Sequence, residues 1–170
     1  MRMLLVLLAI GLIVVFTVQF WRTRYPPTRG QGLERFPDPP KELSGPGGAA
    51  VLPAVEGVYL GTSMAGDWRD RVTVGDIGQR STATLYLSGS GLLIDRITAS
   101  PLWIPAAAVR GAKTGRVLVG RPVGGADLLV TWQLGGRLLD SVFRADDGKV
   151  YPEWLTALRS IAKGSNGAAA

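Results

Sequence analysis

The sequence predicts a mainly β fold: one small β-barrel or sandwich that ends in a single α-helix, joined by a linker to an N-terminal transmembrane helix. Three observations predict it: an uncharged apolar run at the start, a stretch crowded with proline and glycine, and then short alternating apolar runs separated by glycine-rich turns. The 170 residues allow about one domain with a modest core. The expected segments are an anchor at 1–21, a linker at 22–50, a domain at 51–163 and a tail at 164–170.

The N-terminal apolar run, residues 3–21, carries no charged side chain. At about 1.5 Å per residue a helix over this run is about 28 Å long, close to the roughly 30 Å hydrocarbon core of a bilayer. A cleaved signal peptide is the alternative, but no Ala-x-Ala cleavage pattern follows the run. We therefore expect an uncleaved, single-pass anchor.

The charges that flank the run predict its orientation. One arginine precedes the run and several follow it closely, which by the positive-inside rule places the N-terminus outside and the domain in the cytoplasm. The flanking residues are Arg2 on one side and Arg22, Arg24, Arg29 and Arg35 on the other.

The segment 22–50 holds six of the eleven prolines and has no apolar periodicity. Such a composition favours a disordered or polyproline-like tether over a packed structure. Fully extended, it would reach roughly 100 Å at about 3.3 Å per residue. A proline-rich docking site at 37–40 is the alternative that we weighed against a plain tether.

The domain is predicted to hold seven or more short strands. Apolar and polar residues alternate within 82–87 and within 127–134, as half-buried strands require. Gly135-Gly136 indicates a two-residue hairpin, and 88–91 and 146–148 read as further turns. The expected strands are 57–60, 71–74, 82–87, 91–95, 102–105, 108–112, 116–119, 127–134 and 137–145.

A helix is predicted over residues 151–163. Pro152 suits a first helical position, and Gly164 suits a stop. One face of this helix is apolar, and a frayed tail follows it. The apolar face comprises Trp154, Leu155, Leu158, Ile161 and Ala162.

Strands followed by one amphipathic helix suit a small barrel, because the helix can plug an open end. The segments that carry a family likeness are 58–62, 66–68, 70–72, 75–78, 102–105, 130–132, 138–140 and 143–144. On these the chain resembles the PH-like (pleckstrin-homology-like) superfold, and more narrowly the actinobacterial membrane-anchored bacterial PH-like domain proteins. The resemblance implies binding of lipids, peptides or proteins, and it implies no catalytic activity.

The chain has neither histidine nor cysteine. Ser-His-Asp triads, thiolate sites and nearly all zinc chemistry are thereby excluded. The carboxylates are scattered, so we nominate no catalytic residue, metal or cofactor. The net charge of +6 is divided evenly, with six basic and three acidic residues in 1–51 and thirteen and ten in 52–170. A domain this mildly basic does not indicate a nucleic-acid partner.

The first candidate contact site is Trp68 with Arg69 and Arg71. The two arginines could hold an anionic headgroup while Trp68 enters an interface. Alternatively, Trp68 plugs the core while Asp67 and Asp70 pair with the arginines, and the nearly neutral sign pattern favours this structural interpretation.

The second candidate is a basic cluster made of Arg110, Lys113, Arg116 and Arg121, with no acidic residue nearby in sequence. It could contact anionic lipid at about 1 kcal/mol per charge near the surface. The alternative, which we favour, is a solvated rim. By their periodicity, Trp103, Trp132 and Trp154 are expected in the core.

These observations favour a membrane-tethered, non-catalytic binding module that engages a protein partner or anionic lipid at the inner leaflet. A protein is favoured, because a domain that is already anchored gains little from lipid affinity. The alternative is a structural subunit of a larger membrane complex, which a large exposed apolar patch would indicate. An enzyme would require a buried, close set of carboxylates or of serine and lysine.

Overall fold

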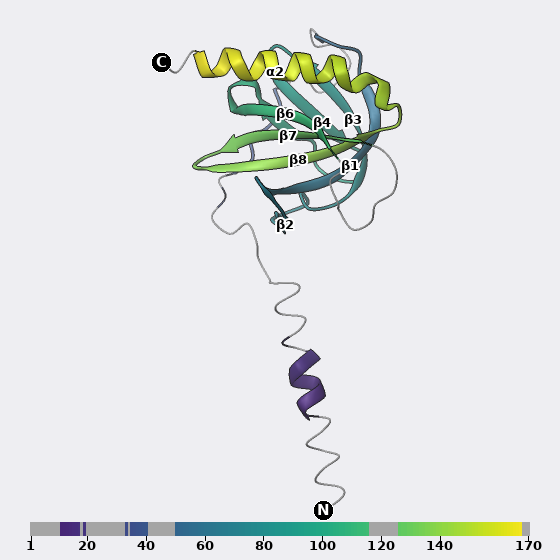
Figure 1. The fold of residues 1–170 in the computed structure, drawn as a ribbon, viewed down its shortest axis with the longest axis vertical. Coiled ribbons are helices and arrows are strands. Elements are labelled where there is room, and N and C mark those ends of the chain that lie inside the picture. The colour runs from purple at the N-terminus through teal and green to yellow at the C-terminus, as the bar shows by residue number, and fades with distance from the viewer. Residues whose placement is uncertain are drawn as a thin grey trace, which may run out of the picture.

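The computed structural model describes residues 11–17, 19, 33, 35–40, 50–115 and 126–167, the last three of these by their backbone alone. In this part the chain forms a curled sheet of eight strands with a helix across one end (Figure 1). The strands are β1 (Val55–Met64), β2 (Asp67–Arg71), β3 (Ser81–Ser88), β4 (Gly91–Arg96), β5 (Leu102–Pro105), β6 (Val109–Gly115), β7 (Asp127–Leu134) and β8 (Arg137–Ala145). The helices are the short 3₁₀ turns η2 (Ala106–Ala108) and η3 (Gly148–Val150) and the long α2 (Tyr151–Gly167).

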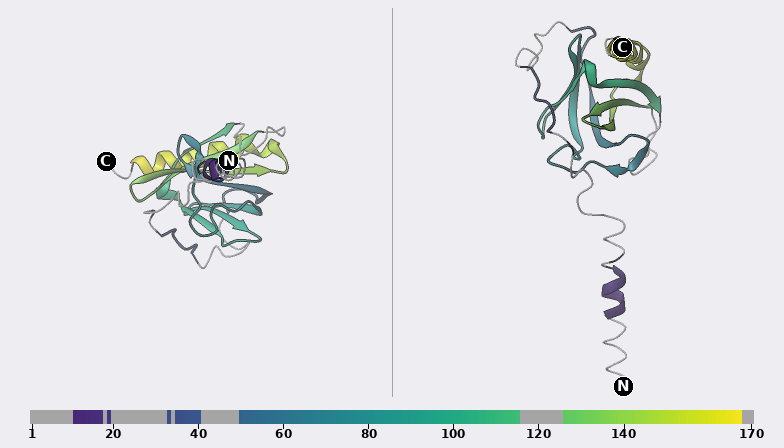
Figure 2. Two further views of the ribbon diagram at one scale, coloured as in Figure 1. Left: turned by 90° about the horizontal axis from the view of Figure 1, so that it is seen from below. Right: turned by 90° about the vertical axis from the view of Figure 1, so that its left-hand side faces the viewer.

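The strands follow the order β5-β4-β3-β1-β8-β7-β6, and each neighbouring pair is antiparallel. β2 lies off this path and pairs with β1. The sheet is open between β5 and β6, and α2 packs along β6, as its end-on view in Figure 2 shows. In Figure 1, α2 and β2 lie at opposite ends of the curled sheet.

The predicted alternation positions the core. In β3, Ala83, Leu85 and Leu87 are all buried, and Thr82 on the opposite face is exposed. The inward side of β7 carries Trp132, which is fully buried. Trp103 and Trp154 are buried as well, so all three tryptophans expected in the core are there. The face of α2 that holds Trp154 and Leu158 closes one end of this core.

A second, smaller apolar cluster lies on the outer face of β1, β8 and β7. It consists of Leu60, Val142 and Leu129, with Val58 packed against them. These side chains alternate with the inward ones, yet all three cluster members are buried. Leu129 is therefore buried although it occupies the outward position of its strand.

Two tight turns match the sequence analysis. Leu134 pairs with Arg137, so Gly135-Gly136 forms the predicted two-residue hairpin loop, with Gly135 at φ 56°. Ser88 pairs with Gly91 across a second two-residue loop.

Several predicted boundaries are wrong. The strand expected at 71–74 is β2 at Asp67–Arg71, because the chain leaves β1 once Val72 has donated its N–H to the carbonyl of Thr62. β6 continues three residues past the expected 108–112 to Gly115, and the expected strand 116–119 lies outside the described residues. α2 continues past Gly164, because a helix tolerates one glycine at a cost of about 1 kcal/mol.

At the N-terminus, residues 11–17 and 19 are helical. Across the described residues, no helix meets the length and apolar character needed to cross a membrane. The remainder of the expected anchor, including 3–10, lies outside these residues.

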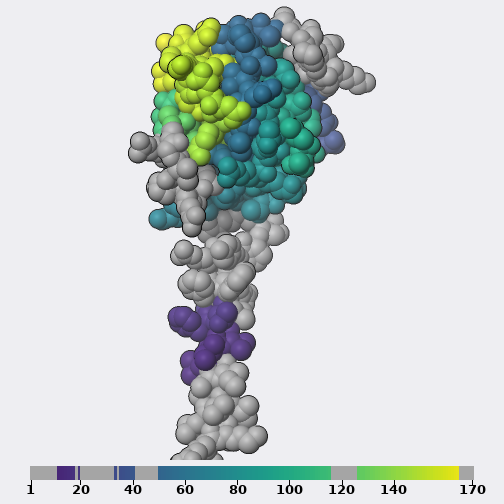
Figure 3. All heavy atoms as spheres, turned by 90° about the vertical axis from the view of Figure 1, so that its right-hand side faces the viewer, coloured from purple at the N-terminus to yellow at the C-terminus, as the bar shows by residue number. Residues whose placement is uncertain are grey.

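Part of the expected linker contacts the domain. Leu33 and Phe36 are half-buried and pack against the main core, and the Phe36 ring lies 6.0 Å from that of Trp132, centroid to centroid. Arg35 and Asp38 form an exposed ion pair of 3.2 Å beside it. In Figure 3 the slate-blue atoms of residues 35–40 lie on the flank of the domain.

Candidate functional site

The hairpin of β1 and β2 forms one end of the domain. β1 pairs with β3 only as far as Tyr59, so its second half has room for β2 on that edge. The turn is fastened to β8: Ala65 N–H donates to the carbonyl of Leu138 at 2.9 Å, and Gly66 N–H donates to Asp140 Oδ2 at 3.1 Å. The hairpin is thus tied to the body of the sheet.

Trp68 on β2 presents its indole to solvent. The residue is 44% exposed, and the guanidinium carbon of Arg69 lies 5.1 Å from the ring centroid, a cation–π arrangement. The carboxylate of Asp67 accepts the backbone N–H of Arg69 at 2.9 Å. The interpretation of Trp68 as a core plug is therefore wrong, because the residue is exposed and belongs to neither apolar cluster.

Arg71 has a structural role. Its Nη2 donates to the carbonyls of Leu60 at 3.0 Å and Gly78 at 3.1 Å, linking β1 to the loop before β3. Gly61 makes this possible: it has φ +130°, and a Cβ there would lie 2.5 Å from Arg71 Nη2. Arg69 and Arg71 therefore do not converge on one anion, because one stacks on Trp68 while the other binds backbone carbonyls.

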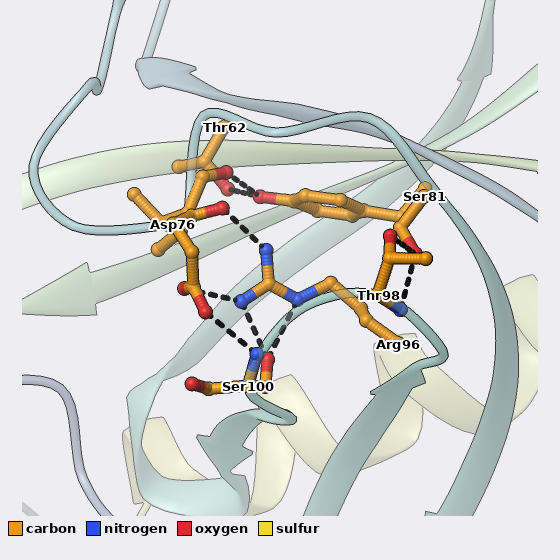
Figure 4. Close-up of polar contacts among 8 residues, drawn as sticks. Thr62, Asp76, Ser81, Arg96, Thr98 and Ser100 are labelled. Atoms are coloured by element: carbon orange, nitrogen blue, oxygen red, sulfur yellow. Dashed lines mark hydrogen bonds and ion pairs between the residues drawn. The ribbon is translucent and has the colours of Figure 1, made fainter.

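A buried arginine organises the neighbouring loops, as Figure 4 shows. The side chain of Arg96 is 2% exposed and its guanidinium lies 5.1 Å from the centroid of the Tyr59 ring. It donates to the carbonyl of Ser100 at 2.8 and 2.5 Å, to the carbonyl of Asp76 at 2.9 Å and to Asp76 Oδ1 at 2.8 Å. One side chain thereby joins the loop before β3 to the turn after β4.

The carboxylate of Asp76 completes this bridge. Its Oδ2 accepts the backbone N–H of Ser100 at 2.6 Å. That hydrogen bond, followed by those from the side chains of Ser100 and Arg96, lowers the pKa of Asp76 below its ordinary 3.8. The bridge is therefore intact at neutral pH.

A chain of hydroxyl groups connects the same region to the core. Tyr59 donates its hydroxyl hydrogen to the carbonyl of Ile77 at 2.8 Å, and burial raises the pKa of Tyr59 to about 12. Trp132 Nε1 donates to Ser141 Oγ at 2.9 Å at the other end. Because each hydroxyl has one hydrogen, Ser141 must then donate to Thr62 (2.6 Å), and Thr62 to Tyr59 (2.7 Å). The order of donors supports a structural role, since none of these groups titrates near neutral pH.

Exposed apolar side chains lie on this scaffold. Val74, at 43% exposed, and Ile97, at 76%, belong to the two loops that Arg96 joins, and Leu138, at 46%, adjoins the β1–β2 turn. We call Trp68, Val74, Ile97 and Leu138 the β2-end surface. Trp68 and Leu138 are the second residues of β2 and β8, Ile97 directly follows β4, and Val74 lies in the loop between β2 and β3.

The charges around the β2-end surface are balanced. Among the exposed or half-buried side chains at this end, four are acidic and four are basic. This end therefore has no formal net charge to attract an anionic bilayer. The residues are Asp67, Asp70, Asp76, Asp95, Arg69, Arg71, Arg80 and Arg137.

The predicted basic cluster is only partly described. Arg110 on β6 donates through Nε and Nη2 to Gln133 Oε1 at 3.1 and 2.9 Å, and through Nη1 to the carbonyl of Ala107 at 2.6 Å. Its guanidinium thus braces β6 against β7 and η2. Lys113 is exposed, and Arg116 and Arg121 lie outside the described residues.

No group of three or more Asp or Glu side chains within the described residues is placed to hold a metal ion. The carboxylate of Asp127 is deeply buried and pairs with Arg144 at 2.6 Å, and this hydrogen bond raises the pKa of Arg144. The pair joins β7 to β8. Across the described residues every buried side-chain polar atom has a hydrogen-bond partner.

Sequence patterns do not indicate the contact between Arg96 and Asp76, because Asp76 lies in the loop before β3 and Arg96, twenty positions later, at the end of β4. They also do not indicate the exposure of Leu138, because two adjacent leucines give no indication of which one faces solvent. Once Leu139 is known to be buried, strict alternation along β8 places Leu138 outward.

Three comparisons with known proteins gave the following results. A chain of a solved structure described as the 8S snRNP assembly intermediate is similar at a TM-score of 0.47 and 12% identity, over 75% of this chain and 88% of that chain. The search of curated proteins found no match. A model of the bacterial PH domain-like family matches residues 33–159. Since this match covers most of the 170 residues, the chain belongs to the bacterial PH domain-like family.

Proposed function

We propose that this protein is a membrane-tethered, non-catalytic binding module that docks a protein partner through the β2-end surface, at the cytoplasmic face of the membrane. Membership of the PH domain-like family suggests a non-catalytic binding module. The observation that carries the choice of partner is the exposed indole of Trp68 under a stacked arginine. Tryptophan and arginine are enriched among the residues that dominate protein–protein binding energy.

The charge distribution favours a protein over a lipid headgroup. A headgroup site needs several cations on one side, and the elements of the β2-end surface carry equal numbers of acids and bases. Two arginines that could have served, Arg71 and Arg110, donate to groups of the domain itself. An apolar surface with a mixed polar rim is instead typical of a protein interface.

The scaffold beneath the surface reduces the entropic cost of binding. The hairpin turn is tied to β8, and Arg96 and Asp76 hold the loops of Ile97 and Val74 together. Loops that are ordered before binding lose less conformational entropy on association. The bridge thus supports a docking surface that is rigid before the partner arrives.

The membrane tether is inferred from sequence. The run 3–21 has the length and apolar character of a spanning helix, and the arginines after it predict a cytoplasmic domain. Anchoring turns a weak contact into one at high effective concentration.

The test is proximity labelling in cells, with a cytoplasmic labelling enzyme fused after Ala170 of the full chain. Trp68→Ala should remove a small, reproducible set of labelled proteins. The matched control is Val51→Ala, because Val51 is 52% exposed and bonds to Leu87 near the other end of β3. If Trp68→Ala and Val51→Ala label alike, the surface is not the docking site. If only envelope proteins are labelled, the cytoplasmic orientation of the domain is wrong.

A structural subunit of a larger membrane complex is the second candidate, and the exposed apolar residues of the β2-end surface favour it. A subunit would remain in one large particle after detergent extraction and dilution, whereas a binding module would dissociate. Native electrophoresis of the full chain distinguishes the two.

A further inference from the structure

The N-terminal segment ahead of the barrel is attached to the core at a defined point. Phe36 packs its ring at 56° to that of Trp132, and Leu33 joins the same cluster. Trp132 is fully buried and its indole N–H is bound to Ser141, so Phe36 contacts a fixed partner. Tilted aromatic pairs at this separation add about 0.5–1.5 kcal/mol beyond their area burial.

A second observation agrees with this attachment. The family match begins at residue 33, three residues before Phe36 and well before β1. The segment from Leu33 to Pro40 therefore belongs to the domain both by packing and by sequence. Three prolines at 37, 39 and 40 restrict its backbone.

We infer that Phe36 fastens the N-terminal segment to the domain, so that residues 22–32 alone act as the membrane tether. The inference rests on the anchor of the proposed function. At about 3.3–3.6 Å per residue, 22–32 reach roughly 36–40 Å, against roughly 100 Å for the whole of 22–50. Residues 41–49 then lie between two segments that the domain holds, and they add nothing to the reach of the tether.

This attachment sets the class of partner. The domain samples a layer next to the bilayer, so its partner is a membrane protein or a protein held at the membrane surface. Effective concentration falls as about the −3/2 power of tether length, so the shorter tether raises it roughly fourfold. A partner far from the membrane is out of reach.

The test measures the height of the domain above a bilayer in the full chain. Since the chain has no cysteine, Ser160→Cys on α2 gives one labelling position for a fluorescent donor, with acceptor lipids in the vesicles. An insert of about twenty Gly/Ser residues, with a root-mean-square length of roughly 25 Å, is placed after Gly30 or after Gly45. The first insert should lower energy transfer, and the second should leave it unchanged.

In the Phe36→Ala background both inserts should lower energy transfer. Leu52→Ala, which also removes a half-buried residue packed on the same core, is the control and should keep the difference between the inserts. If both inserts lower transfer equally without Phe36→Ala, the attachment is refuted. The comparison of the two inserts in the otherwise unchanged chain tests the attachment even if Phe36→Ala unfolds the domain.

Flotation with vesicles distinguishes a failure of the membrane tether from a failure of the attachment at Phe36. If the chain does not float, the membrane tether of the proposed function fails, and this inference fails with it. If the chain floats but the two inserts act alike, the attachment at Phe36 alone is wrong.

Discussion

At the residue scale, a buried arginine holds two loops of the domain together. Arg96 makes four hydrogen bonds within a site that is almost closed to water. Asp76 accepts one of them with Oδ1, and its Oδ2 accepts the backbone N–H of Ser100. Leaving the buried guanidinium of Arg96 unpaired is costly, because the water that it loses on folding is not replaced. The pair therefore acts as a brace for the loops of Val74 and Ile97.

The brace predicts a specific acid sensitivity. The folded pKa of Asp76 lies below the unfolded 3.8, so its contribution to stability is complete above that pH and is lost as the pH falls through the folded pKa. Asp76→Asn should lower the free energy of unfolding at neutral pH, and the gap to the wild type should narrow below about pH 4. Urea unfolding across this range measures it. A gap that stays constant with pH would contradict the assignment.

At the element scale, one long strand and one helix organise the barrel. β1 pairs with β3 and then with β2 on one edge and with β8 on the other, and a bulge between Tyr59 and Gly61 marks the change. Bulges bend a strand and increase its twist. This bend lets the second half of β1 carry the hairpin that displays Trp68.

The helix α2 contributes through its apolar face. Leu158 is fully buried in the main core, whereas Thr156 on the same helix is exposed. Leu158→Ala should lower the free energy of unfolding by about 2–5 kcal/mol, because it removes buried methyl groups and leaves a cavity. Thr156→Ala should change it by less than about 0.5 kcal/mol. Denaturant unfolding of both variants tests this, and equal losses would mean that α2 does not close the core.

At the scale of the whole molecule, the groups that stabilise the fold are distinct from the side chains proposed to dock a partner. The core, the ion pairs and the hydroxyl chain hold the sheet and its loops, while Trp68 on the β2-end surface is 44% exposed. Trp68 can therefore contact a partner without disturbing the core.

This separation predicts the stability of the Trp68→Ala variant. Its free energy of unfolding should fall by less than about 1 kcal/mol, because the indole is not part of the core. Trp132→Ala should cost about 3–5 kcal/mol, since it empties a fully buried site. Calorimetry or urea unfolding compares them. A large loss for Trp68→Ala would show that the residue has a structural role.

Much of the architecture follows from the sequence alone, for local reasons. Alternation in β3 and β7, the Gly135-Gly136 turn and the amphipathic period of α2 each depend on neighbouring residues, so the pattern predicts the element. The absence of histidine and cysteine excludes whole classes of chemistry without any structure.

The tertiary structure decided what distant residues do to one another. In the folded chain Arg71 donates to backbone carbonyls and Arg110 donates to Gln133. Trp68 is exposed, and Arg96 pairs with Asp76. The tertiary structure also seated Phe36 on Trp132, a contact between residues 96 positions apart. A side chain's local pattern predicts which face it occupies, but its partner depends on which loops the closed sheet brings together, and only the folded chain determines that.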